Sequence, residues 1–144
     1  MEDIGNLKQN PLVRFGIHTR SHPVLKRLSD EEIHYEIAGS LDFYRSRIGD
    51  DAPMLSMPFG RLFRDYDERA IAIAKSLSAD VILSAYGGGN AEGQPLYNIR
   101  RISVHEGRLE GGLDDFIGTL RDPAVPYEYI EKEKQLAGLL QKAE

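Results

Sequence analysis

The sequence of 144 residues contains no cysteine. Disulfide bonds and thiolate chemistry are therefore excluded, and any metal ion would have to be held by histidine, aspartate or glutamate. The sequence also lacks a block of basic residues, and its formal net charge is −5, which argues against nucleic acid as the main partner. A weakly acidic chain can still bind neutral ligands such as sugars.

Long apolar runs are also missing. No stretch approaches the roughly 20 apolar residues of a membrane-spanning helix, and the first residues, MEDIGNLKQNPLV, lack the apolar centre of a signal peptide. The cytoplasm is therefore the default expectation for the location of the chain. Length and composition indicate one globular domain over residues 1–144, with a helical tail over 123–144.

Hydrophobic spacing predicts strands that alternate with helices. The strand-like segments are residues 13–17, 54–57, 81–83 and 99–104. The helix-like segments are residues 30–47, 67–77, 113–120 and the tail from about 128. Ser29 and Glu32 form the capping-box pattern that starts the first of these helices. The alternation is typical of βαβ units, so we expect an α/β fold with about four mostly parallel strands.

The segment Gly16-Ile17-His18-Thr19-Arg20-Ser21-His22-Pro23 contains two of the four histidines. It follows the first predicted strand, and in parallel α/β proteins functional groups gather at the carboxyl ends of the strands. Two imidazoles four residues apart can share a metal ion if the chain coils after the strand. The spacing alone favours the simpler alternative, in which His18 makes a local hydrogen bond and His22 lies on the surface.

The wider pattern resembles the NodB-type polysaccharide deacetylases (carbohydrate esterase family four). Their second motif reads H-[ST]-x-x-H-P, which the segment from His18 to Pro23 matches, and a helix start similar to Leu28-Ser29-Asp30-Glu31-Glu32 follows it. Ser56-Met57-Pro58-Phe59-Gly60 resembles the third motif, which has a Pro-aromatic-Gly core. Downstream parts of the family are similar to Tyr66-Asp67-Glu68-Arg69 and Asn98-Ile99-Arg100-Arg101-Ile102. The resemblance covers residues 14–104.

This resemblance implies a partial (β/α) barrel that hydrolyses N- or O-acetyl groups of a polysaccharide or oligosaccharide. A divalent metal, most commonly zinc, would be held by His18 and His22 together with one aspartate. The metal would polarise the acetyl carbonyl and lower the pKa of a bound water. The Phe59 amide would donate to the oxyanion, and Pro58 would fix the turn that holds it.

The resemblance also suggests residues that contact the substrate. Thr19 would steady the metal-binding loop, and Phe59 and Tyr86 would offer ring faces to a sugar, although each aromatic ring could instead pack in the core. His105 is the nominal counterpart of the family's acid histidine, whereas His34 lies within a predicted helix and is expected at the surface. Gly87-Gly88-Gly89-Asn90 lacks the lysine and the spacing of a phosphate-binding loop, and we interpret it as a connector.

One part of the family pattern is missing. The first motif, T-F-D-D-G, precedes the histidines and supplies both the aspartate ligand and the aspartate base, but residues 1–17 contain nothing similar. Asp50-Asp51 follows a predicted helix, so we interpret it as a solvated loop. The chain is therefore expected to be a truncated, impaired deacetylase or, alternatively, an inactive remnant that binds a carbohydrate or a partner. An uncovered sheet edge is also expected, through which chains could self-associate.

Overall fold

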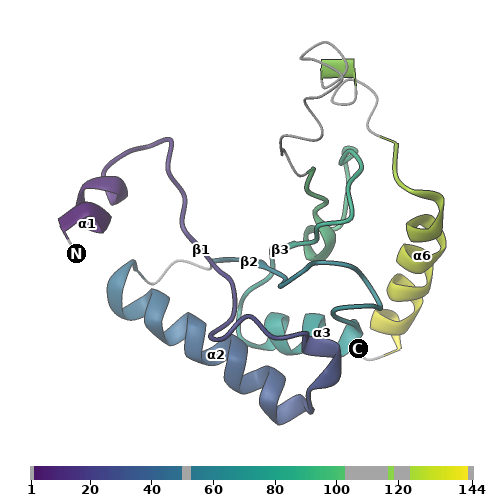
Figure 1. Cartoon of the computed structure of the whole chain (residues 1–144), viewed down its shortest axis with the longest axis horizontal. Coiled ribbons are helices and arrows are strands. Elements are labelled where there is room, and N and C mark those ends of the chain that lie inside the picture. The colour runs from purple at the N-terminus through teal and green to yellow at the C-terminus, as the bar shows by residue number, and fades with distance from the viewer. Residues whose placement is uncertain (1, 50–52, 103–116, 119–123, 143–144) are drawn as a thin grey trace.

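Three short parallel strands form the centre of the fold (Figure 1). The computed structural model describes residues 2–49, 53–102, 117–118 and 124–142. The strands are β1 (Gly16–Ile17), β2 (Met54–Ser56) and β3 (Ile82–Leu83), in the order β1-β2-β3. Ile17 pairs with Leu55, and Leu55 pairs with Ile82. The predicted α/β arrangement with parallel strands is confirmed, and the carboxyl ends of the strands meet at one edge of the sheet.

The fourth predicted strand is reduced to a single parallel bridge between Leu83 and Ile99, within the part of the chain that the structure describes. The backbone of the next residue is hydrogen bonded to a side chain. The Asn90 side chain donates to the Arg100 carbonyl at 2.9 Å and accepts from the Arg100 amide at 2.8 Å. Both backbone groups of Arg100 are therefore engaged away from a strand ladder. Residues 103–104 lie outside the described residues.

Helices follow the strands as the spacing predicts. They are α1 (Glu2–Lys8), α2 (Asp30–Arg47), α3 (Glu68–Ser76) and α6 (Tyr127–Gln141), with short 3₁₀ turns η1 (Leu25–Arg27) and η2 (Leu96–Asn98). The capping box is confirmed, because Ser29 accepts from the Glu32 amide and the Glu32 carboxylate accepts from the Ser29 amide. Asp67 likewise caps α3 by accepting from the Arg69 amide. Of the helix predicted over 113–120, only residues 117–118 are described.

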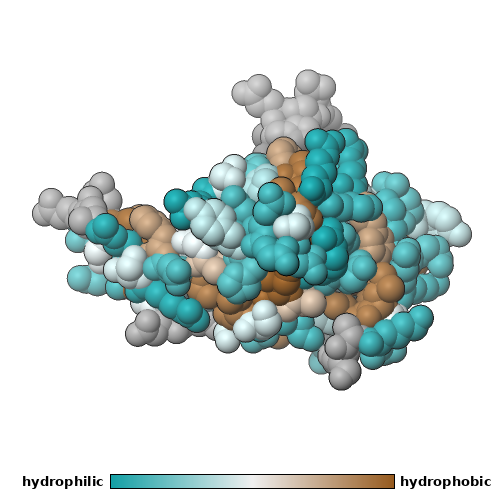
Figure 2. All heavy atoms as spheres, turned by 90° about the horizontal axis from the view of Figure 1, so that it is seen from below, coloured by the Kyte–Doolittle hydropathy of each residue, from teal (hydrophilic) through white to brown (hydrophobic). Residues whose placement is uncertain are grey.

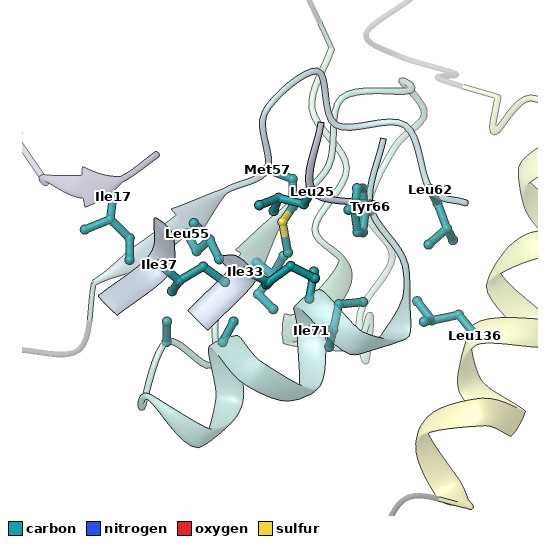
Figure 3. Packing of buried hydrophobic residues seen from close by; sticks show 14 of the residues in the cluster. Ile17, Leu25, Ile33, Ile37, Leu55, Met57, Leu62, Tyr66, Ile71 and Leu136 are labelled. Carbon is teal, nitrogen blue, oxygen red and sulfur yellow. The ribbon is translucent and has the colours of Figure 1, made fainter. Parts of the chain in front are cut away.

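The core lies between the sheet and the two helices that follow β1 and β2. Figure 3 shows Ile33 and Ile37 of α2 and Ile71 of α3 facing Leu55 of β2. These four side chains are fully buried, and each such burial contributes about 1.5–3 kcal/mol. Leu136 of α6 packs toward Leu62 from the other side (Figure 3). The core therefore fixes the strands whose carboxyl ends carry the candidate site.

The outer face of these helices is mixed in character. Figure 2 shows hydrophilic side chains over much of the face seen from below, with hydrophobic ones between them. Among the described residues, no helix combines the length and the apolar character that crossing a bilayer requires. β1 stands at one end of the strand order and has no second strand partner among the described residues. Association of chains through this edge stays a prediction.

Candidate functional site

The two histidines of the second motif lie next to each other after β1. The ring centroids of His18 and His22 are 4.7 Å apart, and the rings are inclined at 74°. The His22 ring is also 4.7 Å from the ring of Phe59, at 71°. Both histidines and Phe59 are exposed. The fold therefore brings the histidine pair and the aromatic residue of the third motif to one surface at the carboxyl ends of β1 and β2.

His18 is oriented by the neighbouring strand. Its Nδ1 lies 2.7 Å from the carbonyl oxygen of Ser56, the last residue of β2. Because a carbonyl oxygen only accepts, Nδ1 donates, and Nε2 is the unprotonated nitrogen of the neutral ring. A backbone carbonyl is a common partner of a metal-binding histidine, since it fixes the tautomer and the direction of the ring. In this tautomer, the neutral His18 ring would present the lone pair of Nε2 to a ligand.

The chain between the histidines is a tight turn rather than a continued strand. Thr19 and His22 have φ angles of 61° and 60°, in the left-handed region that side chains other than glycine rarely adopt. The Thr19 hydroxyl accepts a hydrogen bond from the His22 amide at 3.2 Å. Thr19 thus closes the turn that brings the second imidazole back beside the first. Such conformations persist only where surrounding contacts hold them.

Glu36 of α2 supplies those contacts. Its carboxylate accepts from the Arg20 amide at 2.9 Å, from the Ser21 amide at 2.8 Å and from the Ser21 hydroxyl at 2.7 Å. Burial alone would raise the pKa of Glu36, but the hydrogen bonds from Ser21 and Arg20 outweigh it and leave the pKa below its ordinary value. Glu36 was not predicted as a site residue, although an acidic residue beside Ile33 and Ile37 on the buried face of a helix is a signal for such a role.

We expect Glu36→Gln to lower the free energy of unfolding by about 1.5–3 kcal/mol at pH 7, because hydrogen bonds to a charged acceptor are lost. The pKa of Glu36 is lower in the folded chain than its ordinary value of 4.5, so this stabilisation is present above pH 4.5 and disappears as the pH falls through the folded value. Denaturant unfolding of both proteins at pH 7 and at successively lower pH measures the difference.

Asp42→Asn is the matched control, since Asp42 lies on the same helix and is exposed. An equal loss of stability in Asp42→Asn, or a loss in Glu36→Gln that stays constant down to acidic pH, would contradict this account of Glu36.

The third motif forms a second tight turn after β2. Phe59 and Gly60 have φ angles of 57° and 69°, and the Gly60 amide donates to the Pro58 carbonyl at 2.6 Å. The Gly60 carbonyl accepts from the Ala85 amide at 2.8 Å, which ties this turn to the segment after β3. Pro58 is buried, whereas the Phe59 ring is 53% exposed. No hydrogen bond among the described residues uses the Phe59 amide, so it is available to an external acceptor.

Tyr86 is more buried than a residue that stacks on a sugar is expected to be. Its side chain is 9% exposed, and its ring stacks on Tyr129 of α6 with centroids 4.0 Å apart and planes at 3°. Its hydroxyl lies 2.6 Å from Glu133 Oε1 and 2.8 Å from Asn98 Oδ1. Burial and the Glu133 carboxylate raise its pKa, so the hydroxyl stays protonated and donates. Contact of Tyr86 with a substrate stays a prediction.

Some of the other residues named from the sequence are described by the structure, and some are not. His34 lies exposed on α2 as expected, and the glycine-rich connector is held by Arg100, whose Nη1 donates to the Gly89 carbonyl at 2.6 Å. His105 and the Asp50-Asp51 pair lie outside the described residues.

The histidine pair fits two positions of a catalytic metal site. Such a zinc site uses three protein ligands and keeps one open position, and structural zinc sites use four protein ligands. Among the described residues, no group of three or more histidine, aspartate or glutamate side chains is placed to hold a metal ion. His18 and His22 are thus placed where two imidazole nitrogens could share a metal ion, but the described residues provide no third ligand.

Comparison with known proteins supports the motif assignment. A family model described as polysaccharide deacetylase matches residues 1–82. The matched segment contains the histidine pair, Glu36 and the turn at Pro58, Phe59 and Gly60. Neither the curated proteins nor the solved structures contained a match.

Proposed function

The chain belongs to the polysaccharide deacetylase family, and from this membership we propose that it is a metal-dependent hydrolase of N- or O-acetyl groups on a polysaccharide or oligosaccharide. The observation that carries the proposal is the pairing of His18 with His22, with His18 Nδ1 engaged by the Ser56 carbonyl and Nε2 left free. That arrangement is the one expected of two metal ligands.

His18 and His22 are the proposed ligands of a divalent ion, and zinc is the first candidate because imidazole suits it. When bound, such an ion polarises the acetyl carbonyl and generates a nucleophile from a water molecule. The Ser56 carbonyl orients His18, the Thr19 hydroxyl closes the turn that carries His22, and Glu36 holds the segment between them. Loss of any of these supports would let the imidazoles diverge.

The turn of the third motif is the proposed oxyanion site. The Phe59 amide has no partner among the described hydrogen bonds, and a free backbone amide stabilises the negative charge that develops on the acetyl oxygen. Pro58 and Gly60 fix its direction. The exposed Phe59 ring, which already contacts His22 edge to face, offers an apolar surface to the sugar next to the ligands.

The proposed site lacks a carboxylate ligand and a general base among the described residues. A positioned base typically contributes a factor of about 100 to 10,000 in rate, so we propose that this chain alone is an impaired hydrolase. The same feature favours a second candidate function, in which the chain binds an acetylated carbohydrate or a partner protein without turnover.

Acetate release from N-acetylated chitin oligomers and from an O-acetylated polysaccharide distinguishes these functions. We expect slow release that requires added zinc and stops with a chelator. His18→Ala and His22→Ala should each reduce it by about 100-fold or more, whereas His34→Ala, an exposed histidine on α2, should leave it unchanged. Saturable oligosaccharide binding without acetate release would favour the binding function, and release that ignores both mutations would contradict the metal site.

A further inference from the structure

A cavity lies beyond the carboxyl end of β3, between the segment after β3 and the start of α6. The two segments can be followed in Figure 1. Its volume is about 270 Å³, and the residues that matter for its chemistry are Arg61, Tyr86, Arg101, Glu128 and Tyr129. The proposed deacetylase site does not use it. Two of its lining residues are arginines, although the chain as a whole has a net charge of −5.

Arg101 is a partly buried cation without a counter-charge in the described part of the chain. Its Nε donates to the Ser84 carbonyl at 2.6 Å, and no ion pair or other hydrogen bond of its guanidinium occurs among the described residues. Burial lowers its pKa. The neighbouring Tyr66 cannot balance the charge, because burial raises the pKa of its hydroxyl well above the ordinary value.

The adjacent residue, Arg100, has a guanidinium whose charge is balanced by a carboxylate. Arg100 donates from Nε and Nη2 to the two carboxylate oxygens of Glu133, and this hydrogen bonding raises its pKa. A partly buried guanidinium with free donors is costly unless a ligand supplies the acceptors. Within the described residues, Arg101 therefore differs from Arg100 in having no carboxylate at its two Nη groups.

The rest of the cavity also favours a negative group. Arg61 adds a second guanidinium, which is exposed and makes no ion pair among the described residues. The cavity borders the N-terminal end of α6, where unpaired amides carry partial positive charge. The carboxylate in the lining, Glu128, is 65% exposed and lies 3.5 Å from Lys132 Nζ, which offsets its charge.

Two tyrosines form part of the wall of the cavity. Tyr86 and Tyr129 stack in parallel and both contribute to the lining. The cavity also lies near the histidine site. Phe59 contacts His22, and Arg61, two residues after Phe59, lines the cavity. Neighbouring strands lie about 4.8 Å apart, so the ends of β1 and β3 are about 10 Å apart along this edge. One oligosaccharide chain can span both places.

We propose that this cavity binds a carboxylate group carried by the saccharide, so that the preferred substrate class is an acidic polysaccharide, such as one that contains uronic acid units. Arg101 forms the charged contact with the carboxylate, and Arg61 assists from the rim. The inference rests on the proposed function for the identity of the ligand as a saccharide.

Calorimetric titration of the full chain with an acetylated uronic-acid oligosaccharide and with a neutral chitin oligomer tests this subsite. We expect the acidic ligand to bind at least about tenfold more tightly at low salt, as a charge-assisted arginine contact allows. Arg101→Gln should remove the preference, and Arg61→Gln, at an exposed position, should reduce it. Glu128→Gln, which removes the opposing charge, should increase it.

Several outcomes overturn the subsite. They are equal affinity for the two ligands, a preference that survives both arginine substitutions, or a preference that Glu128→Gln weakens. If the neutral oligomer binds and is deacetylated while no preference for the acidic ligand is found, only the subsite fails. If neither oligosaccharide binds or releases acetate, the proposed function fails with it. Competition by free glucuronate but not by acetate at the same concentration supports recognition of a sugar acid rather than of any carboxylate.

Discussion

Gly60→Ala is expected to destabilise the protein by about 2–5 kcal/mol, the sum of a left-handed backbone for a residue with a Cβ and of overpacking. Gly60 has a φ of 69°, and a Cβ at this position would lie 2.6 Å from both the amide nitrogen and the Cβ of Ala85. The contact is with backbone that hydrogen bonds to Gly60 itself, so it cannot be relieved by a rotamer change. Chemical denaturation of the variant measures the loss.

Gly87→Ala is the matched control for Gly60→Ala. Gly87 has a φ of 85°, but nothing lies within 4 Å of the added Cβ. This variant therefore carries only the backbone cost of about 1–2 kcal/mol. A loss in Gly87→Ala as large as the loss in Gly60→Ala would show that the close approach of the turn to Ala85 contributes nothing. Because Gly60 follows Phe59, the destabilised turn should also weaken the proposed oxyanion site.

Glu133→Ala should cost about 3–5 kcal/mol, as expected when one partner of a buried ion pair is removed. Glu133 lies on α6 and is the shared acceptor for Arg100, the Tyr86 hydroxyl and the Asn98 amide. Burial alone would raise its pKa, but Arg100 and Tyr86 outweigh burial and lower it. The substitution leaves the Arg100 guanidinium, which is 9% exposed, without its carboxylate.

The control for Glu133→Ala lies two residues earlier on the same helix. Glu131 pairs with Lys134 at 2.7 Å, but both side chains are more than 60% exposed, and exposed pairs contribute about 0–1 kcal/mol. Thermal or denaturant unfolding of Glu131→Ala should therefore stay close to that of the parent chain. Similar losses in the two variants would mean that α6 is not held to the sheet by the Glu133 network.

Local signals predicted the parts of this fold that depend on neighbouring residues. Ser29 and Glu32 are three residues apart, so the capping box and the start of α2 could be predicted. Apolar runs located β2 and β3 to within about two residues. The end of the sheet could not be predicted, because both backbone groups of Arg100 are hydrogen bonded to the Asn90 side chain, ten residues earlier, rather than to a further strand.

In the candidate site, too, local patterns could be predicted and contacts between distant residues could not. The motif pattern identified His18, His22 and Phe59, but spacing could not show that Phe59 contacts His22 or that the Ser56 carbonyl orients His18, since these contacts join separate strands. Glu36 and the pairing of Arg100 with Glu133 were not predicted because their partners lie 15 or more residues away in the sequence. The contrast between Arg100, which binds Glu133, and Arg101, which has no carboxylate partner in the described part of the chain, becomes visible only when the side chains are placed.

Zinc titration by calorimetry on the purified chain, beside His18→Ala and His22→Ala, tests the central claim most directly. We predict that the chain binds zinc with micromolar or tighter affinity. Each substitution should weaken the affinity by about 100-fold or more, whereas loss of a residue that only supports a ligand typically weakens metal affinity by about 10- to 100-fold. His34→Ala should bind zinc as the parent chain does. Absence of zinc binding, or binding that is indifferent to both substitutions, would contradict the assignment of this histidine pair as metal ligands.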